Sequence, residues 1–173
     1  MQLGNHVLLV IQTKNKDVSL AFYQKIGYNI IKKNADNIIL NNGKAFFLLH
    51  FGNISSEAKL VYYCPNIALT TAELRFKNIK ISVEKNKQKH TSEVSFQMSE
   101  GFDVLLSDDP QYDIPLEALS NLKYNEIIGG FVEYSLHTKD LEADLLKWQN
   151  IGFKRVLYSD CLSTSAILKH EQL

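Results

Sequence analysis

Few side chains in this sequence carry the chemistry of catalysis or metal binding, and those few are widely spread. The two cysteines, Cys64 and Cys161, are too far apart for a disulfide framework or a CxxC metal site. We expect both to be reduced thiols. Glu133, Ser135 and His137 alternate along one short run, so strand geometry would place them on one face. A lone Glu and His are more typical of a partly wet edge or an interface than of a catalytic site.

The composition describes a globular chain without a dominant charge. Of 173 residues, 45% are hydrophobic, which is ample for a core in one or two small domains. Nineteen basic residues balance nineteen acidic ones, so no excess positive field would attract nucleic acid or anionic lipid. The apolar run from Val7 to Ile11 lacks a basic leader and is far too short to span a bilayer. We therefore expect a cytoplasmic protein that binds neither nucleic acid nor membrane.

The stretch from Asp17 to Ile31 predicts a helix that ends at a glycine and continues into a strand. Gly27 supplies the left-handed conformation that a helix end usually needs. The apolar residues of the helix follow the spacing i, i+3, i+4 and i+8, so we expect them to form its buried stripe: Val18, Ala21, Phe22 and Ile26.

The same block recurs near the end of the chain. Tyr23 to Ile31 aligns with Trp148 to Val156, with an aromatic residue, Gln, Ile-Gly and a second aromatic residue in register. Five coincident positions indicate one supersecondary module that is used more than once.

The patterns around these blocks predict a repeated β-α-β-β-β unit in an α+β fold. In the first unit, strands at 7–11, 29–33, 37–40 and 45–50 surround the helix, and Asn42-Gly43 signals a hairpin. In the second unit, strands at 59–64, 79–84, 92–98 and 102–107 surround a helix that begins after Pro65. We expect that helix to bury a second stripe: Leu69, Ala72 and Phe76.

A third unit follows and is incomplete. It has a strand at 131–137, a helix, and strands at 153–158 and 165–169, without a fourth strand. We divide the chain into a paired-module domain at 1–110, a connector at 111–128 with a helical turn at 116–122, and a partial third module at 129–173. The helix of the third module should bury one further stripe: Leu141, Leu145, Trp148 and Ile151.

This organisation resembles the vicinal oxygen chelate superfamily, which includes glyoxalase I, the extradiol dioxygenases, and the bleomycin and fosfomycin resistance proteins. The resemblance implies curved sheets of paired modules around a shared cavity. Besides the opening strand, it is carried by these segments: Asn15 to Ser19, Ala21-Phe-Tyr23, Ile26-Gly-Tyr28, Asn42-Gly43 and Gly101 to Leu106 ahead of Asp109-Pro110.

In metal-dependent members of the superfamily, four His, Gln or Glu ligands hold a divalent ion that binds two neighbouring substrate oxygens. The resemblance places the following residues at the four ligand positions: Leu8, Leu48, Lys59 or Leu60, and Leu105. Leucine has no lone pair and protonated lysine repels a cation. The resemblance therefore implies an apolar cavity without metal or cofactor, in which Gln12 and Lys59 would add polar contacts to a small-molecule ligand.

An alignment slip of two residues would keep each strand side chain on the same face. It would replace the leucines by His6, His50 and Asp103, which together could hold a metal. In the third module, Glu133 takes the equivalent first-ligand position. His6 and His50 lie at strand ends, where simple exposure to solvent is the alternative interpretation.

Three functions remain open at this point. The first is a metal-free protein that binds an apolar or aromatic ligand, as the bleomycin resistance proteins do. The second is a metal-dependent lyase, isomerase or dioxygenase, which requires the slipped alignment. The third is a scaffold whose cavity is filled by its own side chains.

The odd number of modules also bears on assembly. A third module without its last strand would leave an apolar sheet edge. We expect that edge to pair with a second copy in a homodimer. The competing possibility is that the third module packs back on the first two, which would leave a monomer.

Overall fold

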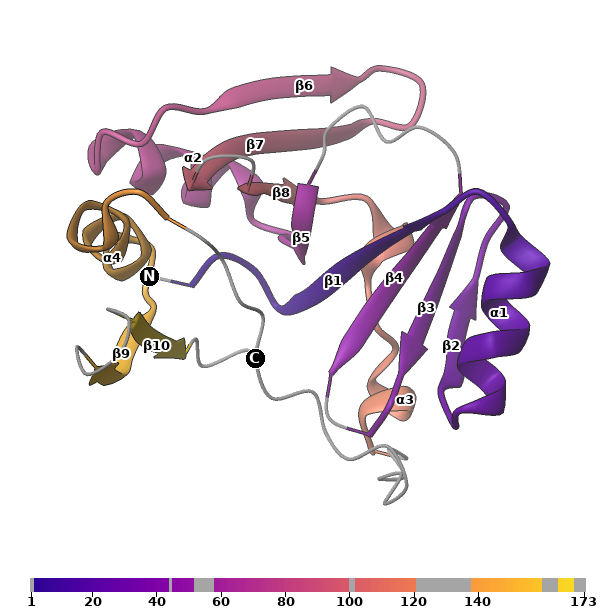
Figure 1. Cartoon of the computed structure of the whole chain (residues 1–173). Coiled ribbons are helices and arrows are strands. Elements are labelled where there is room, and N and C mark those ends of the chain that lie inside the picture. Colours follow the sequence, from indigo (N-terminus) through magenta and orange to yellow (C-terminus); the bar gives the residue numbers. More distant parts are fainter. Residues whose placement is uncertain are drawn as a thin grey trace.

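Two β-α-β-β-β modules share one open curved sheet in the computed structural model of the chain (Figure 1). The structure describes residues 2–43, 45–51, 58–99, 102–120, 138–159 and 165–169. The first module consists of β1 (His6–Thr13), α1 (Lys16–Lys25), β2 (Asn29–Lys33), β3 (Asn37–Asn41) and β4 (Phe46–Phe51). The second consists of β5 (Ala58–Tyr63), α2 (Ile67–Phe76), β6 (Ser82–Asn86), β7 (Thr91–Ser99) and β8 (Phe102–Ser107).

The strand order of this sheet is β2-β3-β4-β1-β5-β8-β7-β6. Each module pairs its first strand with its last in parallel, β1 with β4 and β5 with β8. The two modules meet where β1 and β5 pair antiparallel, with Leu8 opposite Val61. The predicted fold class, with two complete modules and part of a third, is therefore confirmed.

The remaining described elements follow the second module. They are the 3₁₀ helix η1 (Pro110–Tyr112), α3 (Leu116–Ser120), α4 (Leu141–Asn150), and the separate two-stranded sheet of β9 (Lys154–Ser159) and β10 (Ser165–Lys169). The predicted strand at 131–137, with Glu133, Ser135 and His137, lies outside the described residues, as does Cys161. No helix in the described ranges is long and apolar enough to cross a membrane.

All three long helices end in the same way. Gly27 after α1 and Gly152 after α4 have φ values of 94° and 107°, as the helix-glycine-strand pattern predicts. The residue after each glycine donates its N–H to a carbonyl in the last helical turn, Tyr28 to Tyr23 and Phe153 to Trp148. This is the Schellman arrangement, in which the left-handed residue turns the chain out of the helix.

Asn78 takes the same place after α2, with a φ of 58°. Asn tolerates the left-handed region better than other residues with a side chain, and Ile79 then donates its N–H to the Leu74 carbonyl. Because Ile79 and Ile81 pack against the core instead of entering a strand, β6 begins at Ser82. The strand predicted at 79–84 therefore starts too early.

The predicted buried stripes of α1 and α2 are wrong. In α1, Val18 and Phe22 are 64% and 55% exposed, while Leu20 and Tyr23 pack against the core. The Tyr23 ring contacts Tyr28, which in turn contacts the Phe47 ring. This aromatic chain fixes the rotation of the helix.

Helix α2 also buries a different face from the one that the sequence predicts. Leu69 and Phe76 are 64% and 88% exposed. Thr70 and Thr71 are buried instead, because their hydroxyls find partners in the Cys64 thiol and the Ile67 carbonyl. Satisfied hydroxyls can be buried at little cost.

Helix α4 buries the stripe that the sequence predicts, with Leu145, Trp148 and Ile151 at most 6% exposed. It packs on the second module, where the Trp148 indole N–H donates to Ser99 Oγ at 3.3 Å and the ring contacts Phe102. Helix α4 of the third module thus packs back on the second module, in the manner of the competing possibility above. The homodimer stays a prediction.

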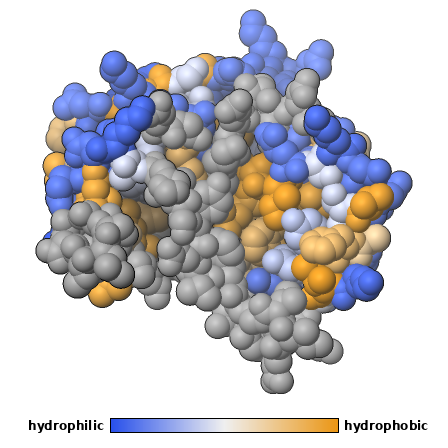
Figure 2. All heavy atoms as spheres, in the orientation of Figure 1, coloured by the Kyte–Doolittle hydropathy of each residue, from blue (hydrophilic) through white to orange (hydrophobic). Residues whose placement is uncertain are grey.

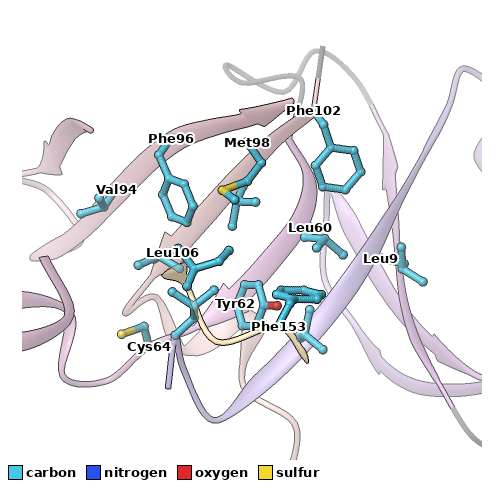
Figure 3. Close-up of a cluster of buried hydrophobic side chains, with 14 of the residues drawn as sticks. Leu9, Leu60, Tyr62, Cys64, Val94, Phe96, Met98, Phe102, Leu106 and Phe153 are labelled. Atoms are coloured by element: carbon cyan, nitrogen blue, oxygen red, sulfur yellow. The ribbon is translucent and has the colours of Figure 1, made fainter. Parts of the chain in front are cut away.

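The sheet has two distinct faces. Helices α1, α2 and α4 lie on one of them, which we call the helix face, over the larger hydrophobic core. Figure 3 shows part of this core, with Phe153 of the third module beside Tyr62 of β5. In Figure 2, hydrophilic side chains form much of the outer rim, and hydrophobic side chains show between them over the strands of the first module. The second face, opposite the helices, carries a smaller cluster described below.

The rotation of α2 can be tested with two leucines of one helix. Leu74→Ala should cost about 2–5 kcal/mol of unfolding free energy, because Leu74 is fully buried. Leu69→Ala should cost less than about 1 kcal/mol, because Leu69 is 64% exposed. Urea denaturation of both variants measures the difference, and equal costs would mean that α2 does not pack as described.

Candidate functional site

Leu8, Leu48 and Leu105 meet on the second face of the sheet, at 0%, 2% and 4% exposure. Leu8 stands opposite Val61 on β5, and Val61 stands opposite Leu105 on β8. Leu48 belongs to the same cluster from β4. Three of the four positions that the resemblance implies are therefore neighbours across the junction of the modules.

From β5, Val61 joins the cluster, instead of Lys59 or Leu60, which the resemblance implies for the fourth position. Leu60 points to the helix face, where it belongs to the larger core. Lys59 lies in β5, but its side chain lies outside the described part of the structure. Gln12 is exposed near the end of β1, opposite His50 of β4, and so stands at the rim of the cluster rather than within it.

A segment that follows the second module covers this cluster. We call residues 109–114 the strap; it includes η1 and leads to α3, which Figure 1 shows on the far side of β3 and β4 in that view. Tyr112 and Ile114 of the strap are 9% and 2% exposed and pack on the leucines. In this structure, the place where the resemblance implies a cavity is filled by the chain itself.

The strap is held at its edges by polar contacts. Lys32 of β2 donates to the carbonyls of Pro110 and Asp113, at 2.6 and 3.2 Å. Asn37 of β3 donates to the Gln111 amide oxygen at 3.3 Å. Asp109 accepts from the Gln111 side chain at 3.0 Å and forms an ion pair with Lys89 of the second module. These contacts tie the strap to both modules.

His6 lies at the rim of the strap, with its Nε2 3.4 Å from Asp113 Oδ1, a contact that becomes an ion pair when His6 is protonated. Its ring also stacks on Tyr63, with centroids 6.4 Å apart. Burial lowers the pKa of His6, and the carboxylate of Asp113 opposes this shift only in part.

His50 lies near the opposite end of β1. Its Nδ1 lies 2.6 Å from the Asn37 amide oxygen, so Nδ1–H is the donor. Its Nε2 is buried and has no hydrogen-bond partner among the described residues. A proton added there would lack solvation, and burial accordingly lowers the pKa of His50, against an opposing effect of Asp36.

The structure does not bring together His6, His50 and Asp103, the metal ligands that a two-residue alignment slip would supply. His50 pairs with Gln12, six positions along β1 from His6, which is about 20 Å of strand. His6 lies opposite Tyr63 of β5, and Tyr63 lies opposite Ser107 of β8. Asp103 is four positions from Ser107, so it lies about 13 Å along β8 from the level of His6. Across the described residues, no three His, Cys, Asp or Glu side chains gather closely enough to hold a metal.

The side chains that meet at this junction do not fit a metal. Leu8, Leu48, Val61 and Leu105 offer only hydrocarbon, and a divalent cation requires N, O or S donors.

An open pocket of about 390 Å³ lies on the second module. Its polar lining residues come from β6, β7, β8 and the segment before β6: Lys80, Ser82, Ser95, Gln97 and Asp103, alongside Ile81 and the buried Phe96. Asp103 is the one residue in this set that the sequence analysis singled out. The others lacked a signal, because isolated Ser, Gln and Lys residues are common on any exposed strand.

Comparison with known proteins identifies the fold. A variant of homoprotocatechuate 2,3-dioxygenase from B. fuscum has 14% identity, a TM-score of 0.61, and coverage of 96% of this chain and 51% of its own. A catechol 2,3-dioxygenase has 12% identity, a TM-score of 0.52, and coverage of 87% and 56%. A glyoxalase/bleomycin resistance protein/dioxygenase superfamily member from Vibrio splendidus 12B01 has 14% identity, a TM-score of 0.42, and coverage of 59% and 97%.

This chain has the fold of the vicinal oxygen chelate superfamily, which confirms the resemblance at the level of fold. It spans about half the length of the two dioxygenases. Neither a protein-family model nor a curated protein matches the sequence.

The lowered pKa values of the two histidines predict how stability depends on pH. An unfolded histidine takes up a proton near pH 6.5, whereas His6 and His50 resist protonation in the folded protein. Acid therefore favours the unfolded chain, so their contribution is present above pH 6.5 and is lost as the pH falls below it. We expect His50→Gln to lose less stability than the wild type between pH 7.5 and 5.

Urea unfolding midpoints at several pH values measure this slope. His90→Asn is the matched control, because His90 lies exposed on the turn between β6 and β7. A His50→Gln slope as steep as that of the wild type would contradict the assignment.

Proposed function

We propose that this chain is a metal-independent binding protein for a small polar molecule, with the open pocket of the second module as its site. The observation that carries the proposal is a hollow of about 390 Å³ whose lining includes Lys80, Ser82, Ser95, Gln97 and Asp103. Small-molecule sites have this size, and a few polar groups fix the orientation of the ligand.

The lining indicates the kind of ligand. Asp103 would accept from an amine or hydroxyl group, and Lys80 would donate to a carboxylate or carbonyl group. Ile81 adds a partly buried apolar contact. We therefore favour a small molecule with both a donor end and an acceptor end, such as an amino acid or a related amine.

The enzyme alternative finds less support. A lyase, isomerase or dioxygenase of the metal-dependent type needs a donor set, and hydrocarbon side chains occupy those positions. The scaffold alternative is favoured by the filled cluster under the strap. The two hypotheses differ in their prediction for the open pocket, since a scaffold would bind no ligand there.

Ligand-observed NMR with a panel of amino acids, small amines and small hydroxy acids, in excess chelator, tests the proposal. We expect at least one binder whose affinity falls about tenfold or more in Asp103→Asn, because a hydrogen bond to a charged group is lost. Asp17→Asn, in the first turn of α1, is the matched control and should bind as the wild type does.

Two results would contradict the proposal. Binding that disappears with chelator, together with one equivalent of metal lost from the protein, would favour the enzyme. The absence of any binder, or equal binding by Asp103→Asn, would favour the scaffold.

A further inference from the structure

We propose that Asp109 in the strap sets the tautomer of His50 in the first module through two side-chain amides, and that this chain of hydrogen bonds is a two-state link between the modules. The inference concerns the polar edge of the strap and not the open pocket, so it does not depend on the proposed function.

Three hydrogen bonds in series join these side chains. Asp109 accepts from the amide nitrogen of the Gln111 side chain at 3.0 Å. The Gln111 amide oxygen accepts from Asn37 of β3 at 3.3 Å, and the Asn37 amide oxygen lies 2.6 Å from Nδ1 of His50 on β4. Because Asn37 and Asp109 are only 5% and 8% exposed, water competes little for their partners.

The carboxylate gives the chain its direction. An ionised carboxylate can only accept hydrogen bonds, whereas an amide has one accepting and one donating end. Gln111 must therefore turn its NH₂ group toward Asp109 and its oxygen toward Asn37, which in turn directs the Asn37 oxygen at His50. The Nε2 atom of His50 has no hydrogen-bond partner among the described residues, so the contact at Nδ1 decides the tautomer and places the proton on Nδ1.

The same chain can also run in the opposite direction. If the group at position 109 donates a hydrogen bond instead of accepting one, both amides turn over, the Asn37 NH₂ group donates to Nδ1 of His50, and the ring proton resides on Nε2. An amide that turns alone would leave two like ends facing each other, so the two amides turn together. The chain therefore has two discrete states, and an element with two discrete states can couple distant sites.

The accepting end of the chain is anchored on the second module. Lys89, on the turn between β6 and β7, forms an ion pair with Asp109 at 3.3 Å. The Asp109 N–H donates to the hydroxyl of Ser107, at the end of β8, at 3.1 Å. A change at Asp109 is therefore transmitted across the strap to a ring in the first module, whose Nε2 is an acceptor in one state and a donor in the other.

Asp109→Asn tests the direction of the chain. The Gln111 backbone N–H donates to Asp109 Oδ1 at 2.9 Å, so an amide at position 109 should keep its oxygen there and present its NH₂ group to the Gln111 side chain. NMR correlation of the ring nitrogens of His50 with its carbon-bound ring protons, at about pH 8, where histidine is neutral, distinguishes the two tautomers. We expect Nδ1–H in the wild type and mainly Nε2–H in Asp109→Asn.

Gln111→Glu supplies a rescue, because its carboxylate would accept from both neighbours in the chain. We therefore expect the double variant Asp109→Asn/Gln111→Glu to return His50 to Nδ1–H, which a general disturbance of the fold would not do. Gln111→Leu interrupts the chain and should give a mixture of both tautomers. Gln88→Leu, on the exposed turn between β6 and β7, is the matched control and should keep the tautomer of the wild type.

The proposal is overturned if His50 carries its proton on Nε2 in the wild type, if Asp109→Asn leaves Nδ1–H as the main tautomer, or if the double variant does not restore Nδ1–H. Should Asp109→Asn fail to fold, Gln111→Leu decides in its place. A tautomer in Gln111→Leu that is unchanged from the wild type would then mean that the chain of amides does not set it.

Discussion

The antiparallel pairing of β1 with β5 is the contact on which the rest of the structure depends. It joins two half-sheets into one, and it places the first strand of each module at the centre, with the last strand of that module beside it. The side chains of these four strands therefore meet on one surface. Leu8, Val61 and Leu105 stand in a row across the junction because of this register.

The two halves of the second face of the sheet differ in character. The first module contributes hydrocarbon, for example Ile39 and Leu48, and this half lies under the strap. The second module adds Val61 and Leu105 to the apolar cluster, whereas its Ser95, Gln97 and Asp103 line the open pocket. The difference arises from a few strand positions on a shared backbone plan, so one fold carries two kinds of surface without any change in topology.

Much of the fold could be predicted from the sequence, because strand alternation and helix ends are local signals. Gly27 and Gly152 correctly predicted the ends of α1 and α4. Asn78 takes the same left-handed conformation after α2, but an Asn does not signal a helix end as clearly as a Gly does. The rotation of α1 and α2 could not be predicted, because tertiary contacts such as the rings of Tyr28 and Phe47 decide it. The strap was missed as well. Its buried residues, Tyr112 and Ile114, alternate with polar ones, but nothing local shows which surface they cover.

The presence of the strap follows from the apolar side chains of the cluster beneath it. A site lined by His and Glu remains hydrated when empty, whereas buried Leu and Val side chains each lose roughly 1.5–3 kcal/mol when exposed to water. A floor that contains Leu8, Leu48 and Leu105 must therefore be covered by something at all times. In this chain the cover comes from the segment that directly follows β8. The polar half needs no cover, since water solvates its Ser, Gln and Asp side chains, and that is why the open pocket lies there.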